Sequence, residues 1–188
     1  MKLNSDRIVS LSAMAVGIGS LFIILYQTQL MRESQHASAL PYLMLAVNAN
    51  QNGVNITLSN AGIGPALIDD IRVRYQGREH LGDVHDFYIS LHPKRDSALS
   101  INKILPGRLI PAGVSIDMLG MNVNPGEERG GLFLVELLHL FEVAEVARSW
   151  YANVGAAGKE KAVIEITYSS VYGDRWRLRS DRFVPEEL

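Results

Sequence analysis

The sequence predicts a mainly β protein, in which one N-terminal transmembrane helix is followed by an antiparallel β-sandwich with one packed helix. Two observations support this fold class. Residues 8–31 form an uncharged, apolar run between charged flanks, and beyond this run several short segments alternate apolar and polar side chains between turns rich in Gly and Pro. A period of two is the pattern of a strand buried on one face, and several such strands joined by tight turns are typical of a sandwich.

The apolar run has the length of a membrane span. As a helix, residues 8–26 would rise about 28 Å, close to the roughly 30 Å thickness of the hydrocarbon core. Lys2 and Arg7 precede the run, whereas Arg32 is the only Lys or Arg between it and Arg72. Positive charges stay on the cytoplasmic side. We therefore expect a single-pass protein of the cytoplasmic (inner) membrane, with residues 1–7 inside and the C-terminal domain outside.

Two alternatives concern this first segment. A cleaved signal peptide would use Ala37-Ser38-Ala39, which has the small-x-small form of a cleavage site. That site lies far from the apolar run, and the run is longer than a normal signal core, so we prefer an anchor of residues 8–31 and a stalk of residues 32–41. Small residues share one side of the helix (Ser10, Ala13, Gly17 and Ser20), so association of the anchors into a homo-oligomer is a further alternative to a lone anchor in lipid.

Composition narrows the classes of function. Residues 42–188 have the size of one ordinary domain with its own core. The formal net charge is −2 with 20% charged residues, which argues against nucleic acid as a partner. The chain has no cysteine, and this excludes disulfides, thiolate metal sites and cysteine nucleophiles.

The elements of the domain follow from periodicity and turn residues. The Asn52-Gly53 pair predicts a hairpin between the first two strands, and Ile71 and Val73 alternate with Arg72 in the third. A short helical turn is expected around residues 83–89, a long loop at 122–131 and a helix at 136–150. Strands are expected at residues 42–48, 54–60, 66–75, 99–105, 114–119, 162–169 and 175–180.

The string Asn60-Ala61-Gly62-Ile63-Gly64-Pro65-Ala66 is the most distinctive local motif. It begins like a dinucleotide-binding fingerprint, but it lacks the third glycine and Pro65 leads into a strand. We interpret it as a structural loop, in which Gly62 and Gly64 supply positive φ and the Asn60 side chain bonds loop amides.

This N-x-G-x-G-P-A connection resembles that of uncharacterised bacterial single-pass membrane proteins with an extracytoplasmic immunoglobulin-like β-sandwich. The closing string Ile166-Thr167-Tyr168-Ser169-Ser170-Val171-Tyr172-Gly173 is similar to their last hairpin. The resemblance covers the anchor, the first three strands and the last two. It implies a location and an immunoglobulin-like fold, and it supplies no catalytic residues.

Two sets of charged or metal-ligating side chains are candidate binding sites. Arginines alternate along two strands, and if these strands share a sheet they form an outward basic surface for a partner (Arg72, Arg74, Arg175, Arg177 and Arg179). The alternative is cross-strand pairing with Glu165 and other carboxylates. The second set, in residues 77–92, is the only cluster of metal-ligand types, without a compact ligand spacing (His80, Asp83, His85, Asp86 and His92).

No catalytic motif is evident. The string Gly113-Val114-Ser115-Ile116-Asp117 lacks the second glycine of a nucleophile elbow, and the adjacent carboxylates Asp69-Asp70 point to opposite faces of a strand. We therefore expect a non-enzymatic, membrane-anchored interaction module without cofactor, whose partner is another envelope protein contacted through the arginines or the loop at 122–131. The alternative function is a small-ligand or metal-ion sensing domain that uses residues 77–92.

Overall fold

The computed structural model describes residues 5–50, 53–92, 99–122, 137, 140–141 and 161–188. The chain divides into two compact units, Met1–Ser38 and Ala39–Leu188. The expected loop at 122–131, beyond its first residue, and nearly all of the expected helix at 136–150 lie outside the described residues.

The first unit is a single helix, α1 (Ser5–Ala37), of 33 residues. Its segment Ile8–His36 has a peak mean hydropathy of 2.4, so it is long and apolar enough to cross a membrane, as an anchor or as a signal sequence. The hydroxyl groups of Ser12, Ser20 and Thr28 donate to backbone carbonyls three or four residues earlier in the helix. Because these donors are satisfied inside the helix, they add little cost to burial in lipid.

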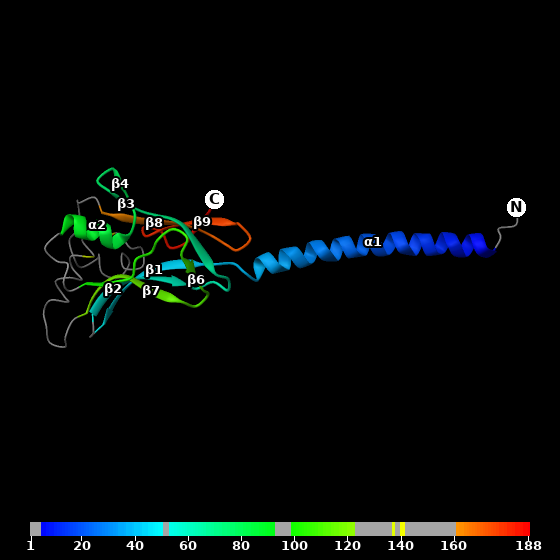
Figure 1. The fold of residues 1–188 in the computed structure, drawn as a ribbon, viewed down its shortest axis with the longest axis horizontal. Helices are drawn as coiled ribbons and strands as arrows, with labels where there is room; N and C mark the ends of the chain where they lie inside the picture. The colour runs from blue at the N-terminus through cyan, green and yellow to red at the C-terminus, as the bar shows by residue number, and fades with distance from the viewer. Residues whose placement is uncertain (1–4, 51–52, 93–98, 123–136, 138–139, 142–160) are drawn as a thin grey trace. The chain divides into compact units, whose positions relative to one another are not determined.

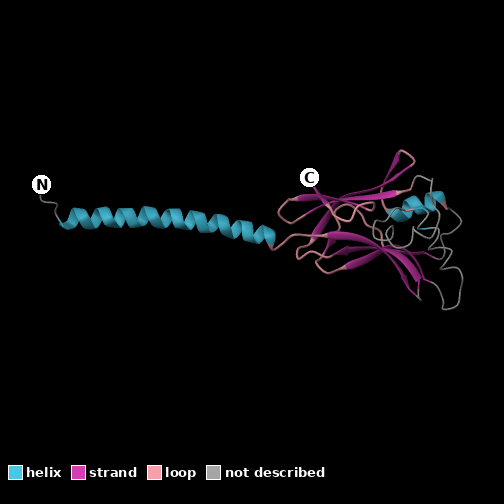
Figure 2. Cartoon of the chain, turned by 180° about the vertical axis from the view of Figure 1, so that it is seen from behind, coloured by secondary structure: helices cyan, strands magenta, loops and turns pink. Residues whose placement is uncertain are grey.

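The second unit consists of two antiparallel sheets, shown in Figure 1 and, from behind, in Figure 2. The first sheet has the order β1 (Leu43–Asn50), β2 (Gly53–Asn60), β7 (Ser115–Asn122), β5 (Leu99–Ile101). The second has the order β10 (Glu186–Glu187), β9 (Arg175–Arg179), β8 (Val163–Ser169), β3 (Ala66–Tyr75), β4 (Arg78–Leu81), and β6 (Leu109–Ile110) also pairs with β3. The mainly β, antiparallel architecture is confirmed. Strands β4, β6 and β10 were not expected.

Apolar side chains from both sheets form one core. Ile56 of β2, Ile71 of β3 and Ile166 of β8 are fully buried or nearly so. The Tyr168 hydroxyl on β8 accepts a hydrogen bond from the backbone N–H of Leu43 on β1 at 3.4 Å, which ties the two sheets together. Burial raises the pKa of Tyr168 to about 12. The two layers therefore share both apolar packing and a polar link.

The region of the expected helical turn contains a helix of two turns, α2 (Val84–Leu91). Asp83 is its N-cap, and Val84, Phe87 and Tyr88 are buried. The Phe87 ring meets that of Tyr75 edge-on at 5.7 Å. The expected helical turn at 83–89 is confirmed, and it is longer than expected because its apolar residues recur at the helical spacing of three and four.

Candidate interaction surfaces

The Asn60 side chain, at the end of β2, organises the loop that follows it. Asn60 is only 1% exposed, and its Oδ1 accepts hydrogen bonds from the backbone N–H groups of Tyr42 at 3.2 Å and Gly62 at 3.0 Å. Its Nδ2 donates to the carbonyls of Gly64 at 2.8 Å and Ile110 at 3.0 Å. All four hydrogen bonds that an amide side chain readily makes are formed. The predicted bonding of loop amides by Asn60 is confirmed.

Gly62 and Gly64 are needed for a reason that differs from the predicted one. Neither residue has a positive φ. A Cβ at Gly62 would instead overlap the backbone of Leu40, Pro41 and Tyr42, and a Cβ at Gly64 would overlap the carbonyl group of Ala39. The prediction of positive φ was wrong, because the loop requires glycine for close approach of two backbone segments.

The same loop binds the start of the domain through main-chain hydrogen bonds. The N–H groups of Ile63 and Gly64 donate to the Leu40 carbonyl at 3.0 and 3.1 Å, and the Ala61 N–H donates to the Tyr42 carbonyl at 2.8 Å. We call residues 60–65 with residues 39–42 the clamp. Pro65, which is half-buried, ends it before β3 begins. The clamp fixes the chain within two residues of the end of α1.

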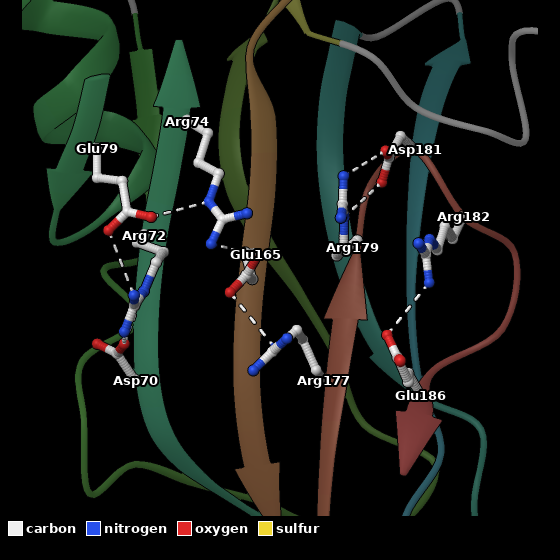
Figure 3. Close-up of polar contacts among 10 residues, drawn as sticks. All are labelled: Asp70, Arg72, Arg74, Glu79, Glu165, Arg177, Arg179, Asp181, Arg182 and Glu186. Atoms are coloured by element: carbon white, nitrogen blue, oxygen red, sulfur yellow. Dashed lines mark hydrogen bonds and ion pairs between the residues drawn. The ribbon is translucent and has the colours of Figure 1, made fainter. Parts of the chain in front are cut away.

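The five candidate arginines do share one sheet, because β3, β8 and β9 are neighbours. Figure 3 shows four of them, Arg72, Arg74, Arg177 and Arg179. Each of them is ion-paired. Arg72 pairs with Asp70 and Glu79, Arg74 with Glu79 and Glu165, Arg175 with Asp69, Arg177 with Glu165, and Arg179 with Asp181. The hydrogen bond to Asp70 raises the pKa of Arg72. Five arginines pair with five carboxylates, so their charges balance on this face. This is the arrangement predicted by the alternative of cross-strand pairing with Glu165 and other carboxylates.

Glu165 lies at the centre of this face. Its side chain is 4% exposed, beneath Arg74 and Arg177, whose nitrogens lie 3.5 Å from its two carboxylate oxygens. The register places Glu165 of β8 between Arg72 of β3 and Arg179 of β9. A buried carboxylate surrounded by arginines has a structural role, because its charge is already balanced within the sheet.

The three histidines of residues 77–92 point to separate partners. The His80 ring packs on Phe87 at 5.0 Å, His85 Nδ1 lies 3.1 Å from Asp86 Oδ1, and the His92 ring lies 4.8 Å from that of Tyr88. Asp86 also binds Lys103 Nζ at 2.8 Å, and this contact lowers the pKa of Asp86. Within the described ranges, no three His, Cys, Asp or Glu side chains come together in a group able to hold a metal ion.

Asp83 is the most perturbed carboxyl group of this region. It is 1% exposed, and its Oδ1 accepts the Val84 N–H at 2.8 Å, whereas its Oδ2 is buried without a hydrogen-bond partner among the described residues. Burial raises the pKa of Asp83 to about 6. His85 Nε2, also buried, lacks a hydrogen-bond partner in the same part of the structure. Asp83 acts as the N-cap of α2 through its Oδ1.

A surface that the sequence did not reveal is the outer edge of β1. In an antiparallel pair, only every second residue of a strand directs its backbone N–H and C=O groups to the neighbouring strand. The hydrogen bond from Ala61 N–H to the Tyr42 carbonyl, with the β1–β2 register, shows that in β1 these residues are Met44, Ala46 and Asn48. The backbone N–H and C=O groups of Leu45 and Val47 therefore point away from β2. β1 is eight residues long, carries no charge and no proline, and pairs with β2 without a bulge.

The other described edge strands are protected. β4 has four residues and includes Arg78 and Glu79, and β10 is two glutamates. β5 has three residues, and β6, which pairs only with β3, has two. Short length and charge are the usual devices that keep a sheet edge from pairing with another chain. β1 has neither device.

Comparison of the chain with protein-family models, with curated proteins and with solved structures finds no match.

Proposed function

We propose that this protein is a membrane-anchored, non-enzymatic interaction module of the cell envelope. Its N-terminus lies in the cytoplasm, and an immunoglobulin-like β-sandwich presents the β1 edge outside the cytoplasmic (inner) membrane to another envelope protein. The resemblance to bacterial single-pass proteins supports the location. The observation that carries the proposal is the edge strand β1, which is long and uncharged and has no partner on its outer side among the described strands, in a domain that follows a membrane-length helix directly.

The edge of β1 suits recognition by strand addition. An extended segment of the partner would pair with the outward N–H and C=O groups of Leu45 and Val47, and so extend the sheet beyond β1. Main-chain hydrogen bonds supply the affinity in this mode, and alternate side chains supply the specificity. Met44, which is 40% exposed, lies on the same strand and would contact the added segment.

The experiment is site-specific photo-crosslinking in cells with a crosslinking amino acid at Met44, and with the same group at exposed Leu81 of β4 as the control position. The test variant is Val47→Pro, because proline removes only an N–H that points away from β2 and is tolerated on an edge strand. We expect an adduct from position 44, none from position 81, and loss of the adduct in Val47→Pro with an unchanged unfolding temperature. An adduct that survives Val47→Pro in a folded protein would refute strand addition.

A further inference from the structure

The second sheet extends beyond the first at the edge of β1. The backbone N–H of Leu43 points away from β2, like that of Leu45. It donates to the Tyr168 hydroxyl of β8 at 3.4 Å, so β8 reaches the outer side of β1. On the opposite side of β1, the Asn60 side chain at the end of β2 donates to the carbonyl of Ile110 in β6, which pairs with β3. β9 and β10 follow β8 on the side away from β3, so they lie beyond the edge of β1.

Trp176 of β9 and Glu187 of β10 project from the inner face of this extension. Trp176 is paired in register with buried Tyr168 on one side and with Glu187 on the other. Because directly paired residues of neighbouring strands lie on the same face of a sheet, all three side chains are on the inner face. The Trp176 ring stacks on that of Tyr168 at 5.7 Å and is only partly buried, and Glu187 is exposed.

The two glutamates of β10 differ in their surroundings. Glu186 is paired in register with Arg177 on the outer face, and its carboxylate binds Arg182 at 3.1 Å. Glu187 lies on the inner face and forms no ion pair with another described residue. Among the described inward residues of β1, β9 and β10, it is also the only charged one. The inner face beyond β1 therefore offers an aromatic ring and a carboxylate without a counter-charge among the described residues.

A strand added to β1 would lie opposite β9. Paired strands are about 4.8 Å apart within a sheet, so one added strand covers the width of one strand in the facing sheet. Its residues paired with Leu45 and Val47 would project inward, because the side chains of Leu45 and Val47 are on the core side. The residue paired with Leu45 would lie nearer to Trp176, since Leu43, two positions earlier, contacts Tyr168. Alternate side chains of the added strand would therefore face Trp176 and, one strand further, Glu187.

We propose that the partner segment added to β1 is an amphipathic strand, with apolar side chains at every second position that cover Trp176 and a lysine or arginine that pairs with Glu187. The apolar residues remove the exposed part of the indole ring from water, and the basic residue supplies a counter-charge to Glu187. An acidic segment would meet like charge there. β1 of a second copy has the alternation but no basic residue. The inference rests on the proposed function and adds the chemical class of the partner's segment.

The test uses a synthetic peptide of alternating valine and threonine with a lysine at each end. One matched peptide has the same composition with its valines side by side, and another has a glutamate in place of each lysine. Each peptide is titrated into the full chain in mild detergent, in a Trp150→Phe background, and the emission of Trp176 is followed. We expect a saturable blue shift with the alternating lysine peptide and about tenfold weaker binding of each matched peptide.

Variants of the chain locate the bound peptide. Glu187→Gln should weaken binding of the lysine peptide about threefold, because an exposed ion pair is lost. The matched control Glu186→Gln, on the outer face of the same strand, should leave the binding unchanged. Val47→Pro should abolish binding at an unchanged unfolding temperature, because proline cannot donate to an added strand.

The other outcomes have distinct meanings. Equal binding of the alternating peptide and the peptide with adjacent valines overturns the amphipathic strand, and equal effects of Glu187→Gln and Glu186→Gln overturn the pairing with Glu187. A blue shift that appears without peptide and grows with protein concentration shows that a second copy occupies the edge, which also overturns the proposal. If no peptide binds, the inference is overturned, but the proposed function stands as long as the adduct from position 44 is lost in Val47→Pro. Absence of that adduct instead refutes the proposed function.

Discussion

Replacement of Asn60 by alanine tests whether the clamp stabilises the domain as its geometry indicates. The change removes four hydrogen bonds of a fully buried side chain. The N–H groups of Tyr42 and Gly62 and the carbonyls of Gly64 and Ile110 lose this partner. A net value of about 1 kcal/mol per buried bond gives a loss of about 4 kcal/mol. Since single domains are stable by about 5–15 kcal/mol, Asn60→Ala should remove a large part of the free energy of unfolding.

The assay is denaturant unfolding of the full chain in mild detergent, followed by the fluorescence of Trp176, which stacks on Tyr168 at 5.7 Å. Trp150→Phe as the background leaves Trp176 as the only tryptophan. The control is Asn48→Ala in the same hairpin, where an exposed amide makes one hydrogen bond, to Thr57 at 2.9 Å. We expect a loss of about 1 kcal/mol or less for this control. Equal losses in the two variants would refute the reasoning.

Three further predictions concern other parts of the domain. Gly64→Ala should lower the free energy of unfolding by about 2–3 kcal/mol in the same assay, because the added Cβ must displace Ala39. The control Ala61→Ser, in the same loop, should change this free energy little. A Gly64→Ala variant as stable as the control would show that the loop is not closely packed. Glu165→Gln should lower the free energy of unfolding by about 1–2 kcal/mol, because Arg74 and Arg177 lose their shared counter-charge. Arg175→Ser, which breaks an exposed ion pair, should lower it by under about 1 kcal/mol. A larger loss in Arg175→Ser than in Glu165→Gln would contradict the pairing. The pKa of Asp83 is raised to about 6 from 3.8, so the folded state favours the protonated acid and stability should fall as pH rises from about 4 to 6. This fall in the free energy of unfolding amounts to about 3 kcal/mol at most, and Asp83→Asn, unfolded at several pH values, should not show it. An identical pH dependence in the two proteins would contradict the assignment of the fall to Asp83.

The strands that could be predicted from the sequence are those long enough to show a period of two. β3 matches its predicted bounds, with Ile71 and Val73 buried and Arg72 on the opposite face. β6 and β10 have two residues each, so no periodicity exists to be read. α2 did carry a helical signal, since Val84, Phe87, Tyr88 and Leu91 have helical spacing after the N-cap Asp83.

The arginine surface shows why the candidate site was harder to predict than the strands. The alternation of Arg72 and Arg74 correctly gives their face, but their carboxylate partners come from other places in the chain. Glu79 lies on the unpredicted strand β4, and Glu165 lies on β8 about 90 residues away. Charge balance on a sheet depends on which strands are neighbours, and that order is a tertiary property.

The roles of Gly62 and Gly64 and of the β1 edge depend on the same kind of information. A glycine motif alone does not distinguish positive φ from close backbone approach. Only the position of Ala39 and Leu40 beside the loop decides between them. Likewise, Leu43–Asn50 reads as an ordinary strand, and its place at the edge follows from the sheet order.

The accessibility of Leu81→Cys in cells tests most directly whether the domain is anchored outside the cytoplasmic membrane. Leu81 is exposed on β4, and the chain has no other cysteine, so a membrane-impermeant maleimide reports one position. In intact spheroplasts, we predict labelling of a full-length protein that stays in the membrane after carbonate extraction. Labelling only after lysis, or release of a shorter form that begins near Leu40, would contradict the account.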